Sequence, residues 1–175
     1  MYARNAKGEM LGYGKINGIN RRKGVGNQMN LIQLLDQRES EILSQAANAL
    51  AREHLTHYDE AGREQNKTQL QTLYDLMAHC IKERDLTTMI RYVDDLAQKR
   101  YAAGFDLREV QTAFNVLEEV IWKQIIQECS PSELGEALGL VSTVHGAGKD
   151  ALASQYVSLA SKTEPASLNL LALFK

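Results

Sequence analysis

The strongest constraint on the fold is the run from Asp85 to Cys129, where two apolar patterns of helical period meet at one glycine. Apolar residues recur at steps of three and four in both halves, which places them on one face of an α-helix. In the first half they are Leu86, Met89, Ile90, Val93, Leu96, Ala97 and Tyr101. In the second half they are Val110, Ala113, Phe114, Leu117, Val120, Ile121 and Ile125. The pattern predicts two consecutive helices, the second over 107–128.

The junction between these two helices has the residues of a tight corner. We expect the first helix to end at Gly104, because glycine enters the left-handed conformation without a steric cost of about 1–2 kcal/mol. Asp106 and Glu109 have the spacing of a capping box, and Phe105 and Val110 have that of a hydrophobic staple. The run therefore specifies an α-hairpin with a short corner, and it specifies no chemistry.

The helix over 107–128 is expected to form the centre of the core. Its apolar stripe is widened by Val116, Trp122 and Ile126. A helix that is apolar over more than half of its circumference is buried by several neighbours. We therefore expect other helices to pack around it on most sides.

The rest of the chain also has helical periodicity. Similar patterns predict three further helices, over 30–57, 67–84 and 131–161. The polar segment 58–66 is expected to be a loop. Only two prolines occur in 175 residues, which suits long uninterrupted helices. We predict an all-α fold of about five helices, forming a globin-like or helical-bundle domain over 30–162.

The two ends of the chain differ from the helical part. Residues 1–29 hold six of the twelve glycines and six basic residues against one acid. Glycine at this density without an apolar period predicts a disordered arm, or a start site placed too early. Segment 163–175 carries five large apolar residues, which are costly to leave in water. We expect this apolar tail to fold back on the bundle, with docking on a partner as the alternative.

Composition and charge exclude several classes of protein. The net charge is −2, so no overall basic balance indicates binding to nucleic acid. No apolar run reaches the roughly 18 residues of a transmembrane helix. We expect a cytoplasmic protein without a membrane partner. Cys80 and Cys129 lie far apart without CxxC spacing, which favours small buried hydrophobic residues over a metal site or a disulfide.

Patterns typical of enzymes and metal sites do not occur in the sequence. No HExxH, GxSxG or zinc-type Cys/His spacing is present. His145 and His79 are weak candidates for a metal ligand, and His145 is the better of the two because it borders an apolar helical face. We expect no enzymatic activity, no metal and no cofactor. The alternative is a sensor that binds haem or a small molecule in a pocket beneath Trp122 and His145.

Arg100 falls where the apolar stripe of its helix would next turn inward. A guanidinium in that place needs a carboxylate or carbonyl partner. We predict an ion pair with Glu118 or Glu119 on the following helix. A contact with a ligand or a partner protein is the alternative.

The last predicted helix contains glycines in its interior. Each one costs about 1 kcal/mol relative to alanine, and close approach of another helix is the usual compensation. Gly139, Ser142 and Gly146 lie along one flank and are the candidate interface residues. We predict a homodimer through this helix, with a local kink near Gly146 as the alternative.

The run from Tyr92 to Trp122 also resembles a known family, the RsbRD N-terminal domain, which is the input domain of RsbR-type stressosome co-antagonists. The residues that carry this resemblance are Arg100, Gly104, Phe105, Asp106, Glu109, Val110, Trp122 and the string Leu117-Glu118-Glu119-Val120. The likeness extends over residues 31–160. It implies a non-catalytic regulatory input domain in bacterial stress signalling that is all-helical, usually dimeric and thought to lack haem.

Members of that family are usually fused to a C-terminal STAS domain, and no STAS domain follows in these 175 residues. The resemblance therefore implies a STAS-domain protein or a kinase as a separate partner.

Overall fold

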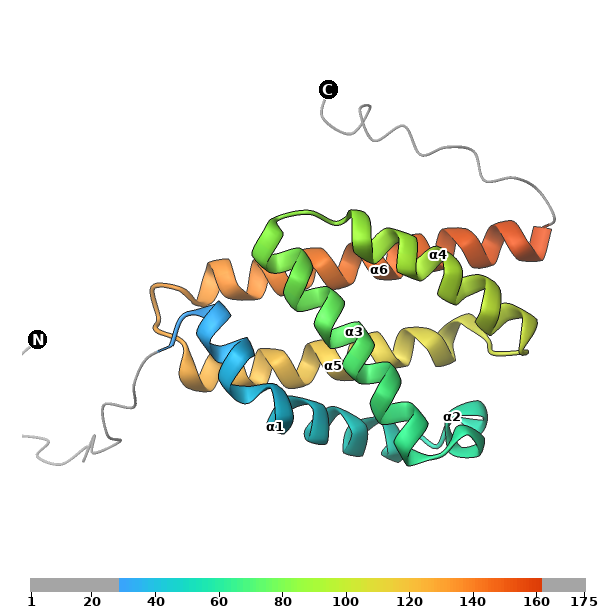
Figure 1. Cartoon of the computed structure of the whole chain (residues 1–175), viewed down its shortest axis with the longest axis horizontal. Coiled ribbons are helices and arrows are strands. Elements are labelled where there is room, and N and C mark those ends of the chain that lie inside the picture. Colours follow the sequence, from blue (N-terminus) through green and yellow to red (C-terminus); the bar gives the residue numbers. More distant parts are fainter. Residues whose placement is uncertain (1–28, 162–175) are drawn as a thin grey trace, which may run out of the picture.

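The computed structural model describes residues 29–161 and shows that they form six helices (Figure 1). Their bounds are α1 Leu31–Arg52, α2 Thr56–Ala61, α3 Arg63–Glu83, α4 Thr87–Ala102, α5 Leu107–Glu128 and α6 Leu134–Ser161. The prediction of an all-α fold is confirmed. The predictions for the N-terminal arm and for the apolar tail concern residues 1–28 and 162–175, which lie outside the described residues. No helix in the described part is long and apolar enough to cross a membrane.

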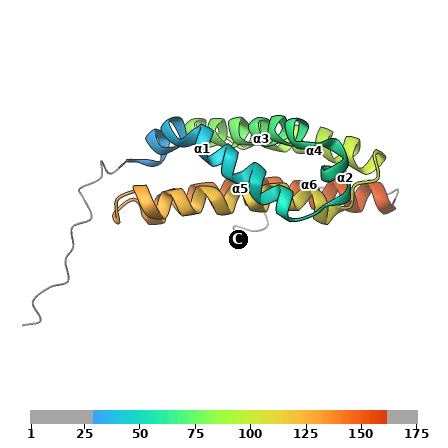
Figure 2. The same cartoon turned by 90° about the horizontal axis from the view of Figure 1, so that it is seen from below.

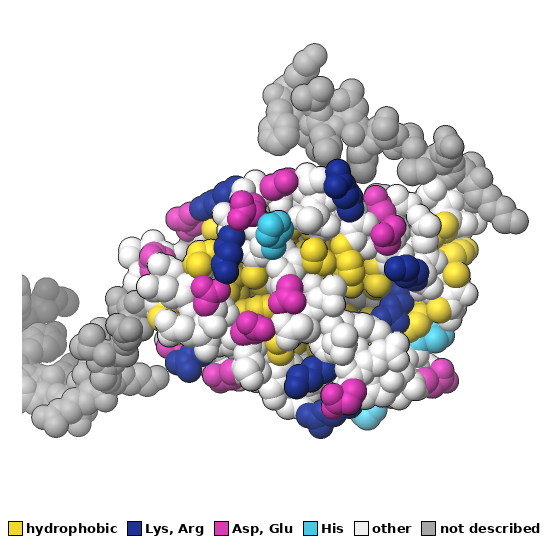
Figure 3. All heavy atoms as spheres, in the orientation of Figure 1, with side chains coloured by type: hydrophobic (Ala, Val, Ile, Leu, Met, Phe, Trp, Pro, Cys, Tyr) yellow, Lys and Arg dark blue, Asp and Glu magenta, His cyan; other side chains and the backbone are white. Residues whose placement is uncertain are grey.

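The helices are arranged in two layers. Helices α3, α4 and the first part of α1 form one layer, and α5 and α6 lie side by side in the other (Figure 2). Helix α1 runs obliquely, so its C-terminal end reaches the level of α5 (Figure 2). Between the layers α4 packs on α6 and α1 packs on α5, while α3 crosses both α5 and α6. Acidic and basic side chains are interspersed among apolar ones on the face over α1, α3 and α4 (Figure 3). The outer side of the α5–α6 layer is not covered by any helix of the described part (Figure 2).

Helix α5 provides the largest share of the core, as its periodicity predicts. Ten of its residues are buried, and Phe114, Leu117, Ile121 and Ile125 are among the largest side chains that are fully buried. Each such side chain contributes about 1.5–3 kcal/mol on leaving water. The packing of α5 against α1 and α6 is therefore a principal source of stability.

The corner between α4 and α5 has the predicted local structure. Gly104 has φ +86°, in the left-handed region. Asp106 is the N-cap of α5, and its Oδ1 accepts from the Glu109 N–H at 2.8 Å. In return, Glu109 Oε2 accepts from the Asp106 N–H at 3.2 Å, which completes the capping box. Both helix ends at the corner thus have their backbone groups satisfied locally.

The expectation that α5 is covered on most sides is only partly right. Trp122 is 39 % exposed and Ile126 is 62 % exposed, although both extend the apolar stripe. Trp122 and Ile126 are four residues apart and share one side of α5. No helix of the described part covers the outer side of the α5–α6 layer (Figure 2). Tyr101, predicted to face inward from α4, is 41 % exposed near the end of that helix.

Several predicted boundaries are also corrected by the structure. The first helix ends at Arg52, and the predicted loop 58–66 contains most of α2 and the start of α3. His54 has φ +50°, so the backbone leaves the helical path between α1 and α2. Met29 is buried and its N–H donates to the Glu128 carbonyl at 3.2 Å, so it belongs to the helical domain rather than to the N-terminal arm. Helix α6 begins at Leu134 after a turn, three residues later than predicted.

Candidate functional site

Aromatic and charged side chains gather at the corner between α4 and α5. The His57 ring stacks on the Phe105 ring, with centroids 4.4 Å apart and planes at 24°. Arg100 Cζ lies 4.2 Å from the centroid of the same phenylalanine ring. Tyr58 meets Phe105 edge-on at 5.6 Å. The corner is therefore an aromatic cluster with a guanidinium against it, and α2 supplies two of its rings.

Glu109 connects this cluster to the helix cap. Besides its bond to the Asp106 N–H, it accepts from the His57 backbone N–H at 3.3 Å and lies 2.8 Å from His57 Nδ1. The carboxylate is buried, so these partners replace the water that it loses. Sequence analysis selected Glu109 as a cap only. It missed His57 and Tyr58, because α2 was interpreted as the end of one helix and a loop.

The predicted ion pair between Arg100 and Glu118 or Glu119 does not form. Glu118 Oε2 accepts from Lys149 Nζ at 2.8 Å, and Glu119 Oε1 accepts from Lys123 Nζ at 2.6 Å. The reason is distance along the helix: at 1.5 Å per residue, position 118 lies about 16 Å from the start of α5, while Arg100 is beside the corner. Arg100 lies instead over Phe105, and a cation–π contact of this kind contributes about 0.5–2 kcal/mol.

A small cavity adjoins the Arg100 side chain. It is bounded by α3, α4 and α5 and has a volume of about 20 Å³. Its lining residues are Tyr58, Asn66, Gln69, Leu70, Leu73, Tyr92, Leu96, Arg100, Val110, Ala113 and Phe114. Asn66 Oδ1 and Gln69 Oε1 are buried without a donor in the described part of the chain. The space suits about one water molecule and is far smaller than the roughly 300–1,000 Å³ of a typical ligand pocket.

Burial sets the protonation of the phenols around Arg100. It raises the pKa of Tyr58 to about 12, and it also raises the pKa of Tyr92. The Arg100 guanidinium opposes this effect in both cases, and burial is the larger cause. Both phenols are therefore neutral hydrogen-bonding groups at physiological pH rather than anionic partners of Arg100.

His145 lies in the core and not at the boundary where sequence analysis placed it. Its side chain is 0 % exposed, its ring meets Phe114 edge-on, and neither ring nitrogen has a hydrogen-bond partner in the described part. Burial, and to a smaller extent the nearby Lys149, lower the pKa of His145 to about 3. The Phe114 backbone opposes this lowering, although the ring makes no hydrogen bond of normal geometry with it. Glu118 Oε2 is 4.0 Å from Nδ1, but Lys149 already neutralises that carboxylate. The imidazole is therefore neutral.

The two histidines considered as metal ligands differ in their exposure to solvent. His79 is exposed on α3, whereas His145 is fully buried. Among residues 29–161, no group of three or more His, Cys, Asp or Glu side chains is placed to hold a metal ion. Trp122 lies at the surface of α5, so the predicted pocket that joins it to His145 is not supported by the positions of the two side chains.

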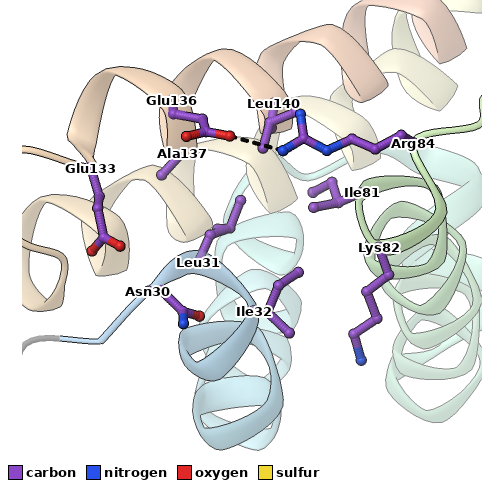
Figure 4. Close-up of a pocket in the computed structure, with 10 residues that line it drawn as sticks. All are labelled: Asn30, Leu31, Ile32, Ile81, Lys82, Arg84, Glu133, Glu136, Ala137 and Leu140. Carbon is purple, nitrogen blue, oxygen red and sulfur yellow. Dashed lines mark hydrogen bonds and ion pairs between the residues drawn. The ribbon is translucent and has the colours of Figure 1, made fainter.

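A surface groove of about 340 Å³ lies where α1 begins, α3 ends and α6 begins (Figure 4). Its apolar lining consists of Leu31, Ile32, Ile81, Ala137 and Leu140. Charged residues at its rim are already paired: Arg84 donates to Glu136 at 2.8 Å, and Lys82 donates to Asp36 outside the groove at 2.8 Å. The groove lacks a convergent set of free polar groups and has no evident catalytic arrangement.

The outer face of α5 and α6 carries the candidate interface residues. We define this α5–α6 outer face by Trp122, Ile126, Gly139, Ser142, Gly146 and Val157. A Cβ added at Gly139 or Gly146 would meet no atom within 4 Å, so both glycines border open space. Gly148 differs, because a Cβ there would lie 2.9 Å from Phe114 Cε1. Close packing against Phe114 thus explains why position 148 is a glycine. No such packing within the described part explains the glycines at positions 139 and 146.

Comparison with known proteins supports the resemblance noted in the sequence. Residues 40–161 match the model of the family described as the RsbT co-antagonist protein rsbRD N-terminal domain. No curated protein and no solved structure matches the chain. The matched range includes the α4–α5 corner, the core helix and the whole of α6. Since the family model covers more than half of the chain, the protein belongs to the RsbRD N-terminal domain family.

Proposed function

We propose that this protein is a non-catalytic regulatory input domain of bacterial stress signalling that acts by binding other proteins. The observation that carries the proposal is the α5–α6 outer face, where the core helix exposes Trp122 and Ile126 beside the flank of α6 that carries Gly139 and Gly146. Exposed apolar side chains that cluster in this way are typical of interaction surfaces. Membership of a family of signalling domains supports the same conclusion.

The first partner that we propose is a second copy of the chain. Gly139 and Gly146 would allow another helix to approach the backbone of α6, with Ser142 between them on the same flank. Burial of a side chain such as Trp122 or Ile126 contributes about 1.5–3 kcal/mol, and tryptophan is enriched among residues that dominate binding energy. The homodimer is thus an expected use of this face.

Analytical ultracentrifugation of the full chain from about 1 to 100 μM tests the dimer, a range that covers micromolar affinities. We expect a monomer–dimer equilibrium in the wild type and at least tenfold weaker association in Gly139→Leu. Ser44→Leu is the matched control, because Ser44 is an exposed position on α1 in the other layer. A wild type that stays monomeric throughout would exclude a dimer of micromolar affinity.

The second class of partner is a STAS-domain protein or a kinase, as the family resemblance implies. Titration calorimetry with a purified STAS domain of an RsbR-type protein measures this interaction directly. We expect binding that is weakened by Ile126→Asp, which places a charge on the α5–α6 outer face, and retained by Ser44→Asp. Equal binding by both variants would show that the partner uses another surface.

No observation favours the alternative of a haem sensor. The cavity beside Arg100 has room for about one water molecule, and the described residues around it are already packed against each other. We expect no Soret absorption band after the purified protein is incubated with hemin. A band that is lost in His145→Leu would restore the alternative.

A further inference from the structure

The α5–α6 outer face carries most of the large apolar side chains that are exposed in the described part of the chain. Four large apolar side chains are exposed in residues 29–161, and three of them, Trp122, Ile126 and Val157, belong to this face. Val157 is 65 % exposed and lies one turn before α6 ends at Ser161. The chain therefore leaves the described domain directly beside an uncovered apolar surface.

The sequence that follows Ser161 has the composition of a segment that packs on such a surface. Residues 166–174 contain no charged side chain, and five of them are large and apolar, namely Leu168, Leu170, Leu171, Leu173 and Phe174. These five side chains gain about 1.5–3 kcal/mol each if they are fully buried. Their burial against the apolar side chains of Trp122 and Ile126 would therefore be favourable.

The segment is also long enough to reach Trp122 from the end of α6. An extended chain advances about 3.3 Å per residue, so Leu170 can lie about 30 Å from Ser161. A helix rises 1.5 Å per residue, so Ser142 lies about 28 Å back along α6. Helices α5 and α6 are antiparallel, and His145 lies beside Glu118. Trp122, four residues after Glu118, is therefore beside the part of α6 that contains Ser142. A segment that turns back at Ser161 places Leu170 and Leu171 beside Trp122.

We infer that residues Leu168–Phe174 dock on the α5–α6 outer face of their own chain, over Trp122 and the flank of Gly139 and Gly146. A Cβ at Gly139 or Gly146 would meet no atom within 4 Å, so the segment can approach the backbone of α6 at these two positions. The groove of Figure 4 fits it less well, because it lies at the start of α6. Ala137 in that groove is about 36 Å from Ser161 along the helix, which is farther than the roughly 30 Å that Leu170 can reach. A tethered segment also has an effective concentration of order millimolar, which favours it over a second copy at micromolar concentration.

The docked segment would occupy the surface that we propose for dimerisation. This consequence rests on the proposed function, whereas the docking itself does not. Displacement of residues Leu168–Phe174 would expose the face, so the segment would raise the apparent dissociation constant of the dimer.

Trp122 is the single tryptophan of the chain, so its fluorescence reports the state of the face. In the full-length wild type we expect emission at shorter wavelength and weak quenching by acrylamide. In the double variant Leu170→Asp, Leu171→Asp we expect a red shift and at least twofold stronger quenching. Asn169→Asp is the matched control, because it adds a charge to the same segment without removing an apolar side chain. The single variant Leu173→Asp repeats the test with a smaller change.

Dilution distinguishes the chain's own segment from a second copy. Protection of Trp122 by its own segment does not change with protein concentration, whereas protection by a second copy is lost on dilution. Equal quenching in the wild type and the double variant, or protection that disappears on dilution, would overturn the inference. Sedimentation of the same samples tests the dimer separately: monomers throughout would exclude the dimer and leave the fluorescence result standing.

Discussion

Acid should destabilise this protein through His145, the fully buried histidine of α6. The groups that face its ring are Glu118 on α5 and Lys149 on α6, and they are paired with each other at 2.8 Å. A proton on the ring would therefore stay in the core without a free counter-charge. The pKa of His145 is lowered from 6.5 to about 3 in the folded state, chiefly by burial.

The direction of the effect follows from the two pKa values. Between pH 6.5 and about 3 the unfolded chain holds a proton on this ring that the folded chain does not. The free energy of unfolding is therefore not reduced by His145 above pH 6.5. Below that pH it falls by about 1.4 kcal/mol per pH unit. Between pH 7.5 and 5.0 the loss is about 2 kcal/mol, a large part of the roughly 5–15 kcal/mol that holds a domain of this size folded.

Urea denaturation at pH 7.5 and at pH 5.0 measures this loss. With a slope of about 2 kcal/mol per molar urea, the wild-type midpoint should fall by about 1 M. His145→Leu is expected to have a smaller fall, because the titrating ring is gone. His79→Leu is the matched control and should keep the full wild-type difference, since His79 is exposed on α3. An unchanged pH dependence in His145→Leu would refute the assignment.

Two further predictions concern glycines. Gly146→Ala should stabilise the monomer by about 0.5–1 kcal/mol through helix propensity, whereas Gly148→Ala should destabilise it by about 1–2 kcal/mol, because its Cβ would lie 2.9 Å from Phe114 Cε1; equal unfolding free energies in urea would contradict this pair. Gly104→Val should cost more than the roughly 1 kcal/mol expected for Asp106→Ala, because Gly104 has φ +86°. Thermal melting checks the order, and an unchanged melting temperature in Gly104→Val would exclude the left-handed corner.

Local signals in the sequence determined the parts of the fold that depend on neighbouring residues. The corner is the clearest case: the conformation of Gly104 and the reciprocal bonds of Asp106 and Glu109 involve residues at most five apart. The helix predicted over 67–84 is present as α3 for the same reason, since periodicity is a property of one helix. The short α2 was missed because six residues carry too little periodicity to be told from a loop.

Tertiary packing determines which sides of each helix are covered by neighbouring helices. Periodicity alone does not say which side of α5 has a neighbour, so Trp122 was expected inside and lies at the surface. Arg100 needed a partner, but only the packing of α2 against the corner brings Phe105, Tyr58 and His57 together around it. His145 is buried because it lies on the side of α6 that faces Phe114 and Glu118 of α5. The sequence by itself determined the helices and the corner of this protein; the arrangement of two layers decided which side chains they bury, pair or expose, because those contacts join residues far apart in the chain.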